Sequence, residues 1–88
     1  MNLEEARSAI EEIDRDIVAL IVKRQEYSTI IAGEKKKLGS SVRDEVQRRK
    51  VLDRAAVLAS ESGLDEESIV KIFDLLVEMN EKAQKNYI

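Results

Sequence analysis

Arg24 places a permanent positive charge inside an otherwise apolar column of a long helical pattern. Every seventh residue from the third belongs to that column, which runs Leu3, Ile10, Ile17, Arg24, Ile31 and Leu38. Lys35 follows Arg24 by eleven residues, about three helical turns, so both cations lie on nearly the same face. Such cations can clamp the carboxylates of a small ligand. The alternative is an ion pair with a glutamate of a partner helix, which would set the register of a coiled coil.

A second helical pattern, near the C-terminus, carries two amides on its apolar side. Asn80 is the one polar member of an apolar column, and Gln84 lies four residues later on nearly the same side. Amide N–H groups can donate to an oxygen that gains negative charge during a reaction. Asn80 and Gln84 can equally hydrogen-bond each other or a backbone group. With Arg24 and Lys35, they suit a small, multiply anionic ligand.

Arg7 lies beside the apolar seam, seventeen residues before Arg24. That separation is roughly 25 Å along one helix, too far for both side chains to hold one small molecule. Two copies of the long helix packed antiparallel across a two-fold axis would bring Arg7 of one chain beside Arg24 and Lys35 of the other. The long apolar seam also requires a partner to cover it. The sequence therefore predicts a homodimer in which Arg7 of one chain can complete the site of the other.

The elements that must position these residues are all helical. The periodicity predicts a single all-α domain over residues 1–88 with three helices, at about 3–38, 43–62 and 65–86. Asn2 and Asp65 are suited to cap helix N-termini, and Gly39 and Gly63 to end helices.

The composition excludes several classes of site. The chain has no cysteine and no histidine, which rules out thiol nucleophiles, disulfides, Cys/His zinc sites and Ser-His-Asp triads. The net charge of −3 argues against nucleic acid as the main partner. No apolar run approaches membrane length and no signal sequence precedes the first helix, so we expect no membrane partner and a cytoplasmic location.

In order and spacing, these residues resemble the all-helical chorismate mutases, the small intertwined-dimer type. The resemblance covers Leu3 to about Tyr87 without a gap. The matching segments are Arg7-x-x-Ile10-x-x-Ile13-Asp14-x-x-Ile17, Ala19-Leu20-Ile21-x-x-Arg24, Lys35, Val42-x-Asp44, Gly63-Leu64-Asp65, Ile72-Phe73 and Gln84.

The resemblance implies an enzyme of phenylalanine and tyrosine biosynthesis that converts chorismate to prephenate by a Claisen rearrangement. This unimolecular step implies no metal and no cofactor. By the same resemblance, Arg24 and the other subunit's Arg7 hold the two substrate carboxylates, and Lys35 and Gln84 hydrogen-bond the ether oxygen. The positions that match the family's substrate contacts are Arg7, Arg24, Lys35, Asp44, Asn80 and Gln84.

The chain departs from the family pattern after Asp44, where the family commonly has an Arg-Glu pair whose glutamate accepts the ring hydroxyl. Those two places hold Gln47 and Arg48. Either Asp44 or Glu45 takes over that contact, or Arg48 binds the substrate by donating to the hydroxyl or to a carboxylate. Asn80 also stands where a serine is often found. The Gln47-Arg48 pair keeps one alternative open, an isochorismate–pyruvate lyase on the same scaffold. A second alternative is a non-catalytic helical dimer or regulatory module in which Arg24 forms only a register-setting ion pair.

Overall fold

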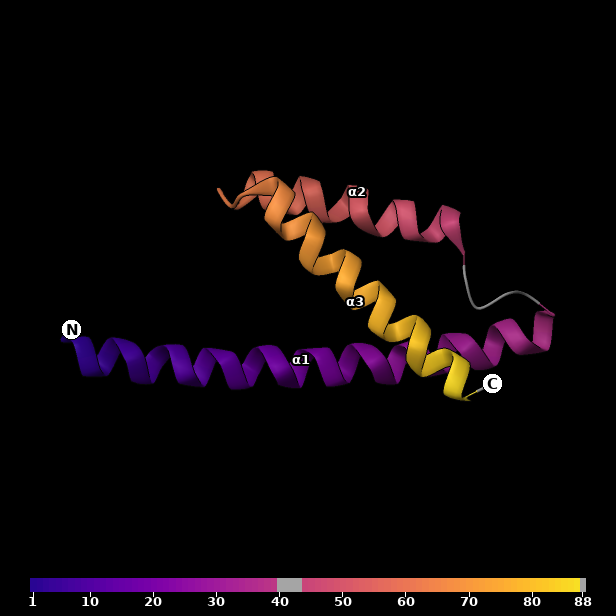
Figure 1. Ribbon diagram of the computed structural model, residues 1–88, viewed down its shortest axis with the longest axis horizontal. Helices are drawn as coiled ribbons and strands as arrows, with labels where there is room; N and C mark the ends of the chain where they lie inside the picture. The colour runs from indigo at the N-terminus through magenta and orange to yellow at the C-terminus, as the bar shows by residue number, and fades with distance from the viewer. Residues whose placement is uncertain (40–43, 88) are drawn as a thin grey trace.

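The computed structural model describes residues 1–39 and 44–87, with side chains through Lys85, and in these ranges it contains three α-helices and no strand. Their bounds are α1 Leu3–Leu38, α2 Glu45–Glu61 and α3 Glu66–Tyr87 (Figure 1). The predicted all-α class with one very long helix is confirmed. The predicted start of the second helix near 43, and Val42 of the family pattern, lie outside the described residues.

Short-range capping interactions explain where the helices begin and end. The Asn2 side chain accepts a hydrogen bond from the Glu5 backbone N–H at 2.8 Å, which satisfies one of the free donors in the first turn of α1. α1 ends where Gly39 adopts a left-handed backbone with φ 71°, a conformation that glycine adopts without a side-chain clash. Asp44 caps α2 by accepting from the Gln47 N–H at 3.1 Å, and Asp65 caps α3 by accepting from the Ser68 N–H at 3.0 Å.

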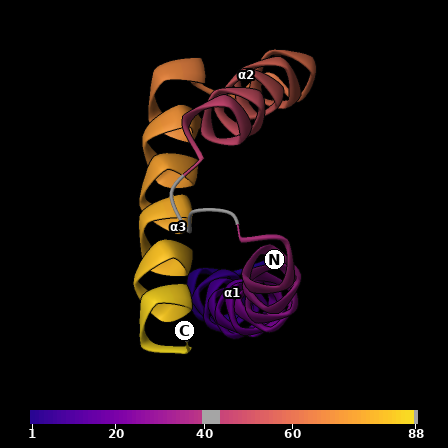
Figure 2. The same ribbon diagram turned by 90° about the vertical axis from the view of Figure 1, so that its right-hand side faces the viewer.

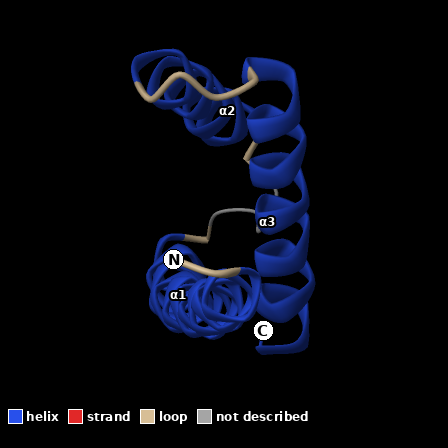
Figure 3. Ribbon diagram, turned by 90° about the vertical axis from the view of Figure 1, so that its left-hand side faces the viewer, coloured by secondary structure: helices blue, strands red, loops and turns tan. Residues whose placement is uncertain are grey.

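α3 is the element that joins the other two helices. It packs against α2 and against the C-terminal part of α1, whereas α1 and α2 make no contact with each other within the described ranges. Figure 1 shows α3 crossing α1 obliquely, and the end-on views show α1 and α2 lying apart on the same side of α3 (Figures 2 and 3). α3 is therefore the element that fixes how α1 and α2 are placed relative to each other.

The core of a single chain is small. Its buried apolar residues are Ala32 on α1 and Val51, Ala55 and Ala59 on α2. The alanines allow α3 to approach its neighbours closely, but no large apolar side chain is fully buried in the described part of the chain. Small domains bury a limited share of their surface. In this chain, many of the apolar side chains that the helices carry are not buried within the chain.

A row of large apolar side chains along α1 remains exposed. Ile10 is 56% exposed and Leu20 65%, and Leu3, Ile13 and Ile17 are similarly exposed. The molecule is 55 Å long, and the N-terminal half of α1 extends well beyond the crossing with α3 (Figure 1). We call this row the α1 stripe, and contiguous exposed apolar surface of this kind marks an interaction site.

Among the described residues, no helix combines the length and the apolar character that a membrane span requires.

Candidate functional site

A cavity of about 260 Å³ lies between the three helices, on the side where α1 and α2 are apart. Six of the seven residues proposed from the sequence line it: Arg24, Lys35, Asp44, Arg48, Asn80 and Gln84. They come from the C-terminal half of α1, the start of α2 and the C-terminal half of α3. The crossing of α3 over α1 therefore gathers residues that lie up to sixty positions apart in sequence.

Arg7 is the predicted residue that does not reach this cavity in one chain. Its side chain is exposed on the first turns of α1. The helix between Arg7 and Arg24 is continuous, which fixes their separation at roughly 25 Å.

Arg24 and Asn80, the polar members of the two apolar columns, meet each other. The Arg24 guanidinium donates through Nη1 to Asn80 Oδ1, and Asn80 is only 6% exposed. The partner of Arg24 within the described residues is thus a neutral amide rather than the carboxylate of an ion pair. Burial first, and then the nearby charge of Arg54, lower the pKa of Arg24. The guanidinium nevertheless stays charged because its ordinary pKa is far above neutrality.

Gln84 is held against α1 by Ser28. Its side-chain Nε2 donates to the Ser28 hydroxyl at 2.6 Å and to the Ser28 backbone carbonyl at 3.2 Å. Gln84 is 7% exposed, and its Oε1 is buried without a hydrogen-bond partner among the described residues. A buried acceptor left unpaired costs about 1–3 kcal/mol, so this amide is fixed in place but not fully satisfied. The alternative of a backbone contact for Gln84 is therefore realised, while its side chain still lines the cavity.

Arg48 links α2 to α3 through two carboxylates. Its Nη1 lies 3.0 Å from Glu81 Oε1, and its Nη2 donates to Asp74. The Arg48 and Glu81 side chains are only 18% and 13% exposed, so this pair is weakly screened by solvent. The positive charge of Arg48 is therefore neutralised within the chain, unlike that of Arg24.

Asp44 and Lys35 approach the cavity from the ends of their helices. Asp44 lines it while serving as the N-cap of α2. Lys35 lies in the last turn of α1 and is partly buried. Glu45, the other carboxylate considered for the ring hydroxyl, does not line the cavity.

Two charged residues of the cavity, Arg54 and Glu81, were missed from the sequence. Arg54 follows Gln47 by seven residues, two turns along the same face of α2. Glu81 lies three residues before Gln84 and so shares its face of α3. The spacing relates each residue to a neighbour on the site. Both residues, however, border polar helix faces, where charged side chains are common and do not by themselves indicate a site.

Comparisons with known proteins match almost the whole chain. The family model described as chorismate mutase type II matches residues 6–85. A chorismate mutase of Methanocaldococcus jannaschii is 36% identical over 86 residues, which cover 98% of this chain and 87% of that protein. A bifunctional chorismate mutase/prephenate dehydratase of Buchnera aphidicola is 30% identical over 82 residues, which cover 93% of this chain but 21% of that longer protein.

Proposed function

Because this chain belongs to the chorismate mutase type II family, and is an enzyme that rearranges chorismate to prephenate in aromatic amino acid synthesis, we propose that the reaction takes place in the cavity between α1, α2 and α3. The observation that carries this proposal is the convergence of Arg24, Lys35 and Gln84 on that one cavity. Neither of the two alternatives, the lyase and the non-catalytic module, is favoured by the comparisons.

The charge of the cavity supports a dianionic ligand. Four cations and two carboxylates of the described residues line it, so its walls carry two positive charges in excess. Chorismate carries two carboxylates, which match this excess in number and are opposite in sign. The volume of about 260 Å³ lies just below the range of roughly 300–1,000 Å³ typical of ligand pockets, which suits a small molecule.

The proposed mechanism is orientation followed by selective stabilisation of charge. Arg24, with Arg7 of the partner subunit, holds the two carboxylates and selects the compact conformer in which the reacting carbons are close. As the ether C–O bond stretches, its oxygen becomes more negative. Lys35 and Gln84 donate hydrogen bonds to that oxygen, Gln84 by exchanging one of its two Nε2 contacts with Ser28 for the substrate. Because these bonds strengthen in the transition state, they lower the barrier.

The α1 stripe supports the homodimer that this mechanism requires. A second copy of α1 packed antiparallel would cover the stripe and carry its own Arg7 toward the Arg24 end of the first copy. Each of the two equivalent sites would then be completed by the other chain.

We propose that Arg48 donates to the ring hydroxyl of chorismate rather than clamping a carboxylate. Its charge is already neutralised by Asp74 and Glu81, so little net attraction remains for a further anion. A guanidinium has five N–H donors, and the hydrogen bonds to Glu81 and Asp74 leave donors for a neutral hydroxyl. The cytoplasmic location stays a prediction.

The decisive experiment adds purified protein to chorismate, follows the ultraviolet absorbance and identifies the product by NMR. We expect prephenate at a rate far above the uncatalysed one. No turnover by folded protein, together with salicylate and pyruvate from isochorismate, would replace this proposal with the lyase.

A further inference from the structure

Arg54 faces the same cavity as Arg24 from the opposite helix. Arg24 projects from α1 and Arg54 from α2, and these two helices do not contact each other within the described ranges. Val51, one turn before Arg54, is buried and also lines the cavity, so this face of α2 borders the cavity. The two guanidinium groups therefore approach one space from two sides.

The two arginines are not neutralised in the way that Arg48 is. Arg48 has two carboxylate partners, Asp74 and Glu81, whereas the described residues supply no carboxylate to Arg24 or Arg54. The charge of Arg54 contributes to the lowered pKa of Arg24, so the groups are close enough to repel each other. Like charges facing across a cavity are unfavourable unless an anion lies between them. Arg54 is exposed, so solvent screens part of this repulsion, whereas Arg48 is paired with carboxylates within the chain.

We propose that Arg54 is a substrate-binding residue that holds one carboxylate of chorismate together with Arg24. This inference rests on the proposed function. A carboxylate has two oxygens and accepts from guanidinium groups on both sides, and such charge-assisted hydrogen bonds are among the strongest in proteins. Binding would also remove the repulsion between the two arginines.

The charge balance of the cavity favours a cation at position 54. Gln47, two turns before Arg54, lines the cavity with a neutral side chain. Without Arg54, the described cavity walls would carry one excess positive charge against the two negative charges of the substrate. Arg54 thus supplies one of the two excess positive charges of the described cavity walls.

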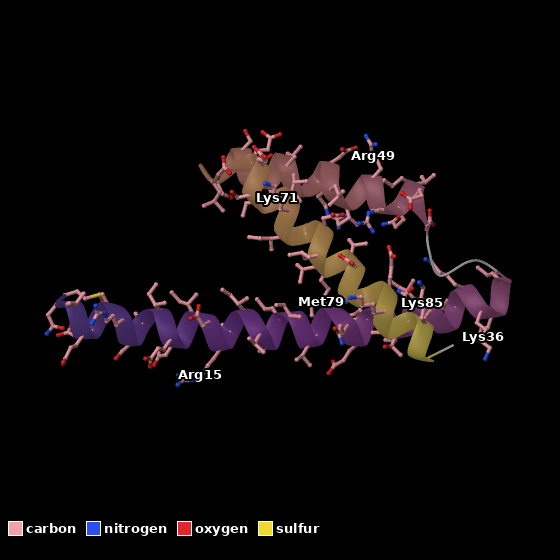
Figure 4. The ribbon with its side chains drawn as sticks, viewed as in Figure 1. Arg15, Lys36, Arg49, Lys71, Met79 and Lys85 are labelled. Carbon is pink, nitrogen blue, oxygen red and sulfur yellow. The ribbon has the colours of Figure 1, made fainter. Side chains whose placement is uncertain are left out.

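The test compares Arg54→Gln, Arg54→Lys and the matched control Arg49→Gln in steady-state assays with chorismate. Arg49 lies on the same helix and projects from the side of α2 away from α1 (Figure 4). We expect Arg54→Gln to raise KM about tenfold to a hundredfold, the value of a charged hydrogen bond. The kcat should change little, because ground and transition states lose the same contact. Arg54→Lys should retain most of the affinity and Arg49→Gln all of it, with unchanged circular dichroism in every variant.

The outcomes separate this inference from the proposed function. Wild-type protein that rearranges chorismate, with a wild-type KM for Arg54→Gln, overturns the role of Arg54 alone. The same conclusion follows if Arg54→Lys binds as weakly as Arg54→Gln, because the positive charge would then not be what matters. Wild-type protein that neither turns over chorismate nor binds prephenate in calorimetry overturns the proposed function and this inference together.

Discussion

At the scale of single residues, the hydrogen bond between Arg24 and Asn80 is the feature that unites the site. Each residue is the polar exception in an apolar column, and each is explained by the other. The bond also orients a cation toward the cavity without neutralising it. A residue that is misplaced on its own helix is therefore correctly placed in the assembled fold.

Replacing Arg24 should separate activity from folding. We expect Arg24→Ala to lower kcat/KM by about 10²-fold or more, because a carboxylate of the substrate loses its cation. Unfolding should become easier by only about 1–3 kcal/mol, the cost of the unpaired Asn80 acceptor. Steady-state kinetics and urea titration measure the two effects. Arg15→Ala is the control, since Arg15 projects from the side of α1 away from α2 (Figure 4). A variant that is active but unstable would make Arg24 a structural residue.

Gln84 should leave a distinct signature in the pH dependence of the rate. Its amide is neutral at every relevant pH, so we expect no acid-side loss of kcat from this residue between about pH 7 and pH 5. A glutamate at this position donates only when protonated. Gln84→Glu should therefore be slow at neutral pH and gain activity as the pH falls toward the ordinary pKa of glutamate, about 4.3. A flat profile for this variant would exclude hydrogen-bond donation by residue 84.

Some residues of the site are predictable from the sequence and others are not, and the difference has a physical reason. Arg24 and Asn80 are visible because a polar side chain in an apolar column is costly and requires a partner. Arg54 and Glu81 are invisible by that criterion, because each borders a polar face where charge costs little. Only the crossing of three helices reveals that these faces meet at a cavity.

At the scale of the elements, local chemistry was predictable and packing was not. Asn2, Gly39 and Asp65 mark helix ends through their own side chains or backbone, so the sequence alone indicates them. The oblique course of α3, and the separation of α1 from α2, depend on side chains far apart in the chain. Periodicity indicates Arg24, Lys35, Asn80 and Gln84 as one site, whereas only the family resemblance adds Asp44 to it.

The Asp65 cap should make the stability of α3 depend on acid. The Ser68 hydroxyl, and then the Ser68 backbone N–H, hold the pKa of Asp65 below its ordinary value. A lowered folded-state pKa means that the stabilisation is complete above the ordinary value of about 3.9 and is lost as the pH falls through the lowered value. Asp65→Asn keeps a capping oxygen but does not titrate. Thermal unfolding at a series of acidic pH values should show a shallower decline for this variant. Equal declines would remove Asp65 from the acid response.

At the scale of the whole molecule, the proposed dimer makes each site depend on two chains. Arg7→Ala and Arg24→Ala should each be nearly inactive alone. When the two variants are unfolded and refolded together, half of the dimers are mixed, and each mixed dimer contains one site with both arginines. We expect recovery of about a quarter of the wild-type activity on this statistical basis.

The absence of recovery would contradict the shared site. The control mixes Arg15→Ala with Arg24→Ala, because Arg15 is placed at no site and this mixture should only dilute the wild-type-like chains. Size-exclusion chromatography with light scattering must show the same dimer for each variant and each mixture.

The exposed α1 stripe affects how the thermal stability of this protein should be measured. A chain that leaves Ile10, Leu20 and their neighbours in water has gained only part of its hydrophobic stabilisation. If a second copy supplies the remainder, the native state is a dimer formed from two chains. Its unfolding equilibrium then depends on protein concentration, and the midpoint of unfolding rises as the concentration rises. Dilution then lowers the melting temperature. A melting temperature of this protein is therefore meaningful only together with the protein concentration at which it was measured.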